Sequence, residues 1–370
     1  MILLNDFQRQ WDEIRADVLA TVETVGAGGW YILGSELSAF EKALAEQWGM
    51  AHSVGVASGL DAIEISLKAL GCEAGDLVLT TPLTAFATTL AIVKLGAIPV
   101  FAVCDPHGLI DLQLCREILR ARRDIRYFVP VHLYGQSLDL AALRLLRDEF
   151  DLRIVEDCAQ SILATSGGLA TGSVGQMAAT SFYPTKNLGA FGDGGAILTD
   201  DPALAARVRC LRDYGQSGKY RHSEIGYNSR LDELQAALLR RVQLPRLSGW
   251  TARRRLIAAR YDGGIRHALI RPMGSPPDSN SCWHLYPVLT PAGRKRDFLV
   301  WLKSQGVAAG EHYPILMPDQ SAMKGVAHQV IGECARARSI ALGEVSLPIH
   351  PYLTDAEIGR VIEVCNRWSG

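Results

Sequence analysis

The chain has 370 residues, with 38 lysines and arginines against 39 aspartates and glutamates, and a formal net charge of −1. A chain with this balance lacks the global positive field that drives non-specific nucleic-acid binding, so we expect no nucleic-acid partner. Hydrophobic residues make up 48% and charged residues 21%, which is typical of a folded globular chain and excludes intrinsic disorder. At roughly 150 residues per domain, the length allows two or three structural units.

We expect neither a leader peptide nor a membrane anchor. The first residues carry no basic segment followed by an apolar run, and the apolar stretch 90–103 is interrupted by Lys94, Gly96 and Pro99. It is shorter than the roughly 20 residues that a membrane span requires. The eight cysteines are scattered without a Cys-x-x-Cys pair, which disfavours a zinc site and a disulfide framework. We therefore expect a cytoplasmic protein with no metal site and no membrane partner.

Short apolar strands alternate with helices in the first half of the chain. Apolar residues recur at helical spacing over 35–48, and a β-rich segment follows at 53–57. The alternation then predicts helices at 61–70, 85–95, 111–121 and 139–149, and strands at 77–80, 98–103, 126–131 and 152–156. This pattern is typical of an α/β fold with a mostly parallel sheet that helices cover on both faces. Ligands of such sheets bind beyond the carboxyl ends of the strands.

The character of the sequence changes after Asp157. Small, β-prone segments around 179–183 and 194–199 predict antiparallel additions to the same sheet. A long helix is predicted over roughly 230–260, and we interpret its basic run, Arg253-Arg254-Arg255, as a solvent-exposed helix face. Residues 265–370 alternate again at lower hydrophobicity. We therefore expect a large domain over 1–250 and a small α/β domain over 251–370.

Two segments carry residues suited to chemistry. Val155-Glu156-Asp157 is an apolar strand that ends in two carboxylates, one of which we expect at the carboxyl edge of the sheet. Lys186 lies in a turn between two strand-like runs, where flanking aromatic residues would partly desolvate it. Desolvation lowers the pKa of a lysine and makes it a nucleophile toward aldehydes. Taken alone, this pair fits a structural ion pair better than a catalytic site.

Five segments in this order resemble the nucleotide-sugar aminotransferases of the DegT type. They are Ala57–Ala62, Pro130–Gln136, Glu156–Gln160, Ser181–Ala190 and Gly226–Ala236. The resemblance implies the architecture of fold-type-I pyridoxal-phosphate enzymes. That architecture has a large domain with a central, mostly parallel seven-stranded sheet flanked by helices, and a small C-terminal α/β domain. It also implies pyridoxal 5′-phosphate as the cofactor.

The resemblance gives two residues a catalytic role. Lys186 would bond covalently to pyridoxal phosphate and, once released, would move a proton between the substrate carbon and the cofactor. Asp157 would pair with the pyridine nitrogen and keep it protonated, so that the ring withdraws electrons. Gln160 would lie beside the ring, although its alternative interpretation is a polar residue that caps the end of the strand.

The same resemblance implies how the cofactor phosphate is bound. Ser181 and the N–H groups of Gly59 and Leu60, at a helix N-terminus, would hold it. Asn228 would reach the phosphate of the neighbouring subunit. The active site would then require a homodimer with shared sites.

Substrate contacts are less well defined by the resemblance. Candidates are Tyr183, Lys219, Tyr220 and Tyr313. Lys219 and the loop around it would meet the nucleotide diphosphate, whereas Tyr183 equally fits a core aromatic residue. We expect His132 and His312 to be structural hydrogen-bonding residues, because Lys186 already supplies the proton relay.

Three segments depart from the family pattern. The family commonly has an aromatic residue that stacks on the cofactor at the position of Ala85, whereas here the aromatic residue is Phe86, which we expect to bind the cofactor instead. After Gln160 the chain has Ser-Ile-Leu in place of the usual small residue, histidine and glycine, so the wall beside the ring is more apolar. The segment 312–320 lacks the second histidine that many relatives carry near Pro318.

The segments 59–61, 214–215, 219–220 and 224–230 are most similar to the branch that aminates C3 of dTDP-3-keto-6-deoxyhexoses. The reaction expected from this resemblance is transfer of an amino group from L-glutamate to the 3-keto group of a nucleotide-linked keto sugar, a dTDP-3-keto-6-deoxyhexose, in amino-sugar biosynthesis. Two alternatives are a 4-keto nucleotide-sugar aminotransferase and a cofactor-binding regulatory protein without turnover. A third, a sugar dehydratase of the same family, would carry histidine in place of Lys186.

Overall fold

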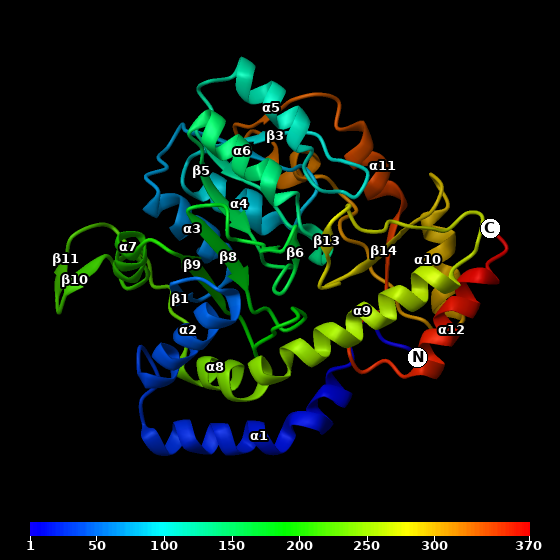
Figure 1. The fold of residues 1–370 in the computed structure, drawn as a ribbon, viewed down its shortest axis with the longest axis horizontal. Coiled ribbons are helices and arrows are strands. Elements are labelled where there is room, and N and C mark those ends of the chain that lie inside the picture. Colours follow the sequence, from blue (N-terminus) through cyan, green and yellow to red (C-terminus); the bar gives the residue numbers. More distant parts are fainter.

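The computed structural model describes residues 1–370, and an eight-stranded sheet forms its centre (Figure 1). In spatial order the strands are β1 (His52–Val56), β9 (Gly195–Thr199), β8 (Met177–Ser181), β5 (Arg153–Asp157), β4 (Tyr127–Val129), β2 (Leu77–Thr80), β3 (Ile98–Phe101) and β15 (Gln329–Val330). Every neighbouring pair is parallel except at β9, which runs antiparallel to β1 and β8. The α/β class and the mostly parallel sheet are confirmed. The two-residue β15 adds an eighth strand to the seven that were expected.

Alternate residues of the strands build a core on each face of the sheet. Val78 and Val155 pack on one face, whereas their neighbours Leu79 and Ile154 pack on the other, as the two-residue period of a strand requires. Helices α3 (Gly59–Ala69), α4 (Phe86–Lys94) and α7 (Pro202–Arg212) cover the first face, and α2 (Ser35–Trp48), α5 (Leu112–Ala121), α6 (Leu140–Phe150) and α8 (Glu233–Leu238) cover the second. Both faces are therefore buried, which leaves the strand ends as the place for a site.

A side-chain cap starts helix α3 directly after β1. The hydroxyl of Ser58 accepts a hydrogen bond from the backbone N–H of Asp61 at 3.1 Å. A cap of this kind satisfies one of the N–H groups that the first turn leaves without an intrahelical acceptor. The N–H groups of Gly59 and Leu60 in the same turn have no intrahelical acceptor. This helix end therefore offers free donors at the carboxyl edge of the sheet.

A helical segment crosses from the large sheet to the small one, diagonally in Figure 1. It comprises α8, a π-helical turn (Leu239–Gln243), a 3₁₀ turn (Leu244–Arg246) and α9 (Leu247–Gly264). Pro245 has no N–H to donate, which is why regular α-helical bonding is interrupted there. Leu247 packs in the core of the large sheet and Ile257 in that of the small one. The boundary expected at residue 250 thus falls within a helix.

The small sheet is antiparallel and lies beside helices α10 and α12. Its strands are β12 (Arg271–Pro272), β14 (Tyr286–Leu289) and β16 (Glu344–Leu347), and the helices are α10 (Lys295–Ser304) and α12 (Asp355–Asn366). Ile2 pairs with Val307 beside this sheet, so the first residues of the chain belong with the C-terminal part. Leu316 and α11 (Ala335–Gly343) instead pack in the core of the large sheet. The division into a large and a small domain at residue 250 remains a proposal. In it, the first residues of the chain belong with the small domain, and Leu316 and α11 belong with the large one.

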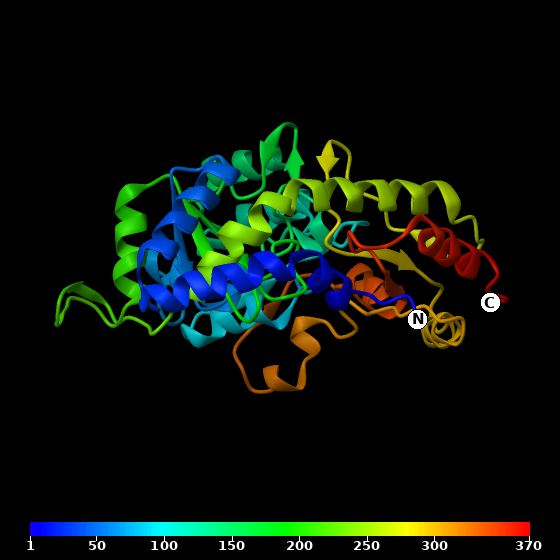
Figure 2. The same cartoon turned by 90° about the horizontal axis from the view of Figure 1, so that it is seen from below.

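Several peripheral elements were not predicted from the sequence. They are α1 (Phe7–Gly28), the hairpin β10 (Gln216–Gly218) and β11 (Arg221–His222), and a small sheet of β6 (Thr165–Ser166), β7 (Leu169–Ala170) and β13 (Ser279–Asn280). Figure 2 shows an elongated molecule with both termini near the small sheet and the β10–β11 hairpin at the opposite end. None of the helices has both the length and the apolar composition that crossing a membrane requires.

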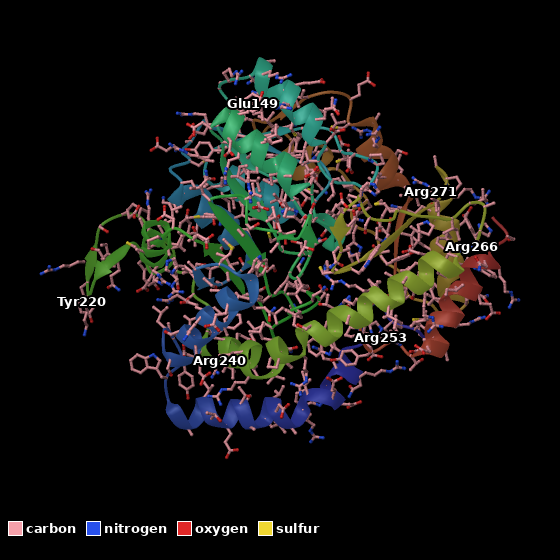
Figure 3. The ribbon with its side chains drawn as sticks, viewed as in Figure 1. Glu149, Tyr220, Arg240, Arg253, Arg266 and Arg271 are labelled. Atoms are coloured by element: carbon pink, nitrogen blue, oxygen red, sulfur yellow. The ribbon has the colours of Figure 1, made fainter.

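The interpretation of the basic run 253–255 as an exposed face is wrong. Arg254 is buried, at 5% exposure, and its guanidinium donates to the backbone carbonyls of Trp283, at 3.3 Å, and Ile349. Arg253, labelled in Figure 3, pairs with the first residue of α12 at 2.8 Å. These arginines therefore join α9 to the C-terminal part of the chain.

Candidate functional site

A cavity of about 410 Å³ lies at the carboxyl ends of β1, β8 and the neighbouring parallel strands. The predicted site residues that line it are Gly59, Leu60, Asp157, Gln160, Ser181, Tyr183, Lys186 and Tyr313. They come from four separate segments of the sequence, which the fold brings together. The volume is within the range of about 300–1,000 Å³ that small-molecule and cofactor sites occupy.

Asp157 supplies the buried carboxylate of the cavity. Its Oδ2 accepts a hydrogen bond from the hydroxyl of Thr88 at 2.8 Å, and its Oδ1 accepts one from the backbone N–H of Ala159 at 3.1 Å. Burial raises the pKa of Asp157, while these two donors oppose the shift. Glu156, the other carboxylate of the pair, does not line the cavity and bonds to His132 at 2.8 Å. One carboxylate of the two lies at the site, as the sequence predicted.

Lys186 lies in the loop that follows β8. Its backbone N–H donates to the carbonyl of Tyr183 at 2.8 Å, and the N–H of Ala190 donates to that of Phe182 at 2.7 Å, so the loop is fixed at both ends. Desolvation lowers the pKa of the Lys186 amine to about 8, although Asp157 acts in the opposite direction. A lysine with such a pKa has a sizeable neutral fraction near pH 8 and is a competent nucleophile.

A narrow cradle of donors lies beside Lys186. A Cβ atom on Gly59 would come within 2.6 Å of the Cβ of Ser181, so only glycine allows the helix end to approach this strand end. The hydroxyl of Ser181 and the N–H groups of the first turn of α3 then converge at one end of the cavity. Donors at the positive end of a helix favour an anion such as a phosphate.

Gln160 and Tyr313 form another wall of the cavity. Oε1 of Gln160 accepts from the backbone N–H of Tyr134 at 2.7 Å, and its Nε2 donates to the hydroxyl of Tyr313 at 3.1 Å. Burial raises the pKa of Tyr313 to about 12, so its hydroxyl stays protonated. Gln160 thus has fixed partners within the wall, and contact with a cofactor ring stays a prediction.

Phe86 does not line the cavity, so its contact with a cofactor stays a prediction that the cavity lining does not support. It is the first residue of α4, and its ring packs against the apolar cluster of Phe101, Met317 and Met323. Ala85 and Ala87 line the cavity in its place. Adjacent residues at the start of a helix point in different directions. The side chain of Phe86 therefore points to the apolar cluster and away from the cavity that its two neighbours line.

Besides Phe86, three predicted residues lie outside the cavity of their own chain. Tyr220 and Lys219 belong to the β10–β11 hairpin, and Tyr220, which is 82% exposed, lies at the far edge of the molecule in Figure 3. Asn228 is exposed and pairs by its backbone with Asp213. No contact within this chain brings these side chains to Lys186. Their roles as phosphate and substrate contacts stay predictions that need a second chain.

The structure adds polar residues to the cavity that were not predicted there, among them Thr88, His284 and His312. Thr88 bonds to Asp157, and its hydroxyl lies 3.1 Å from that of Thr84, four residues earlier in the sequence. His284 and His312 also line the cavity, and burial lowers the pKa of both imidazoles. The Thr-x-x-x-Thr spacing was a usable signal for Thr88. Neither histidine lies in a motif that signals a site.

Comparisons with known proteins agree with this geometry. The model of the DegT/DnrJ/EryC1/StrS aminotransferase family matches residues 12–366. The dTDP-3-amino-3,4,6-trideoxy-alpha-D-glucose transaminase of Streptomyces venezuelae is 40% identical over 368 residues, which are 98% of this chain and 95% of that protein. A pleiotropic regulatory protein of Geobacillus stearothermophilus is 35% identical over 359 residues, 97% of this chain and 96% of that one.

Among solved structures, S. venezuelae DesV in complex with a ketimine intermediate superposes on this chain with a TM-score of 0.93. The two chains are 40% identical, and the match covers 100% of this chain and 98% of the other. The chain belongs to the DegT/DnrJ/EryC1/StrS aminotransferase family.

Proposed function

We propose that this protein is a pyridoxal-phosphate-dependent transaminase that transfers an amino group from L-glutamate to the 3-keto group of a dTDP-linked 3-keto-6-deoxyhexose. The observation that carries the proposal is the desolvated Lys186 amine, which shares a cavity with the buried carboxylate of Asp157 and the donors at the start of α3. The relative at 40% identity, which is named for a dTDP-3-amino sugar, supports the choice of carbon and nucleotide.

The residues present fit pyridoxal phosphate. The cavity has an amine for the aldehyde in Lys186, a carboxylate for the pyridine nitrogen in Asp157, and a cradle for the phosphate where Gly59 approaches Ser181. A larger residue at position 59 would fill this cradle. When bound, the cofactor supplies an aldehyde that accepts amino groups and a ring that withdraws electrons from the reacting carbon.

Asp157 and Lys186 have different roles in the proposed reaction. Burial disfavours the charged form of Asp157, whereas the hydroxyl of Thr88 and the N–H of Ala159 favour that form and fix its two oxygens in place. Lys186 has a pKa low enough to give up and take back a proton near neutral pH, which suits a residue that moves a proton at a substrate carbon.

A homodimer is part of the proposal. A run of large apolar side chains between α1 and α2 is exposed, with Trp30 at 65% and Tyr31 at 57%, and Ile225 near Asn228 is 84% exposed. Contiguous exposed apolar side chains mark protein interfaces. We infer that a second copy covers these side chains, and the shared phosphate site further requires that this copy brings its Asn228 to the cavity, whose lining in one chain lacks this residue.

The test uses purified protein with bound pyridoxal phosphate. We expect glutamate to bleach the absorbance of the cofactor bound to Lys186, and a dTDP-3-keto-6-deoxyhexose to restore it with formation of the 3-amino sugar. The 4-keto isomer is the matched control and is expected to react far more slowly. Exclusive turnover of the 4-keto sugar would refute the C3 assignment.

The second candidate, a regulatory protein that binds the cofactor without turnover, is favoured by the name of the Geobacillus relative. A cofactor spectrum that no amino donor changes would support it. The complete set of Lys186, Asp157 and Thr88 in one cavity supports the transaminase instead.

A further inference from the structure

A second, much smaller cavity shares Thr185 and Lys186 with the candidate site. Its other walls are the start of α1, helix α9 and the segment that follows β16. The cavity has a volume of about 30 Å³, which is close to the share of one molecule in liquid water. It can therefore take only a small species.

Arg254 brings a buried charge to this cavity without an acidic partner. Desolvation lowers its pKa to about 10, so the guanidinium is still charged at neutral pH. Its acceptors are the backbone carbonyls of Trp283, His284 and Ile349, and all three contact Nη1. Nε and Nη2 donate to no group of the chain. A buried charge is costly unless a counter-charge pairs with it, so this one favours an anion.

Two neutral side chains of the same cavity also lack partners. His350 is 3% exposed, and neither of its ring nitrogens has a hydrogen-bond partner at normal geometry. The hydroxyl of Tyr352 has none either. Burial and Arg254 lower the pKa of His350 to about 4, although the carbonyl of Leu3 acts in the opposite direction, so the neutral ring keeps one N–H donor. Buried polar groups are nearly always hydrogen-bonded, so these donors point to a ligand.

The charges around the cavity favour an anion over a water molecule. Two cationic side chains, Arg254 and Lys186, line it together with one carboxylate, that of Asp6. This carboxylate is already engaged, since Oδ1 accepts from the backbone N–H of Arg9 at 3.0 Å and Oδ2 lies 3.3 Å from Nε of the same residue. Water would satisfy the free donors but would leave Arg254 without a counter-charge.

We propose that this cavity binds a small inorganic anion, of the size of chloride, as the counter-ion of Arg254. The free N–H groups of Arg254 donate to the ion, and the N–H of His350 and the hydroxyl of Tyr352 complete its shell. The inference concerns binding alone, so it does not depend on the proposed function.

Crystals of the holoenzyme grown in sodium bromide test the site directly. Bromide has the charge of chloride and scatters X-rays anomalously. We expect an anomalous peak in the cavity, within hydrogen-bonding distance of Arg254 and His350, and its loss in His350→Phe. An ordered water without anomalous signal at this position would overturn the inference, as would bromide bound at the protein surface only.

Urea unfolding of the holoenzyme tests the same site in solution. An ion that binds only the folded chain stabilises it by mass action. With a dissociation constant of about 50 mM, chloride at about 500 mM would shift the folding equilibrium about tenfold relative to gluconate, which is too large for the cavity. We expect Arg254→Gln and His350→Phe to lose this shift.

Arg255→Gln is the matched control for the solution test. Arg255 also donates to backbone carbonyls, those of Ser281 and Leu163 at 2.9 Å, but it does not line the cavity. This variant should keep the full chloride shift. His350→Phe retains an aromatic ring and removes both nitrogens, so the test stands even where Arg254→Gln does not fold. An equal chloride shift in wild type, His350→Phe and Arg255→Gln would place the ion elsewhere and refute the site.

Discussion

Two groups of predicted site residues differ in how the chain holds them. We call Asp157 and Lys186 the floor of the cavity, and Asn228 and Tyr220 its flank. On the floor, Asp157 has two donors within the chain, and the loop of Lys186 is fixed by backbone hydrogen bonds at both ends. On the flank, Asn228 and Tyr220 are exposed and contact nothing in the cavity. The floor is therefore complete in one chain, whereas the flank depends on what covers it. Mutations should affect the two regions in different ways.

The largest effect is expected on the floor, from Asp157→Asn. The amide keeps the shape of the side chain but removes the charge that would hold the pyridine nitrogen protonated. We expect kcat to fall by roughly 10²–10⁴-fold with the cofactor still bound, measured by turnover and by cofactor absorbance on the same sample. Thr88→Val, which removes only the hydrogen bond to Asp157, should cost less. Loss of the cofactor from Asp157→Asn would instead make the carboxylate a binding residue.

A mixing experiment tests whether the flank comes from a second chain. Lys186→Ala and Asn228→Asp subunits should each be inactive as pure preparations. Refolded together in equal amounts, half of the dimers are mixed and one of their two sites is intact, so we expect about a quarter of wild-type activity. The control is refolding of each variant alone. No recovery on mixing would place Asn228 in the same site as the Lys186 of its own chain, or outside any site.

This difference also explains how far the sequence could predict the site. Asp157 and Lys186 follow directly from strands, and consecutive strands of one sheet bring their ends together, so a motif is enough to place them. His312 and Ser346 are 34 residues apart, and no local pattern records that pairing. Arg254 looked like an exposed basic residue because its acceptors are backbone carbonyls from distant segments, which have no signature in the sequence.

The lowered pKa of Lys186 predicts a pH dependence of stability in the protein without cofactor. The folded-state pKa, about 8, lies below the ordinary value of 10.5. Between these values the unfolded chain binds more protons, so the folded state gains stability as the pH rises, and below pH 8 the penalty is fully present. Lys186→Met should therefore be more stable than wild type by on the order of 1–3 kcal/mol at pH 7, with a difference that shrinks toward pH 10.5.

Urea unfolding of both proteins at a series of pH values measures this difference. Lys68→Met serves as the control, because this lysine lies on α3 outside the cavity. A difference that stays constant from pH 7 to 10 would mean that desolvation does not act on the Lys186 amine. The floor of the site would then be less buried than the structure indicates.

The smallest effect is expected at Phe86, which the sequence placed on the cofactor and the structure places outside the cavity. Its ring packs on Phe101, Met317 and Met323, and leucine retains much of that packing. Phe86→Leu should cost about 1 kcal/mol of stability and change the dissociation constant of the cofactor by less than about twofold, since the ring is outside the reach of the cofactor. Ala85→Phe is the matched change, because Ala85 lines the cavity and an aromatic ring there meets the bound cofactor. The contrary result is a larger change in the cofactor dissociation constant for Phe86→Leu than for Ala85→Phe. The ring of Phe86 would then have to turn into the cavity when the cofactor binds, and the cavity would not be preformed.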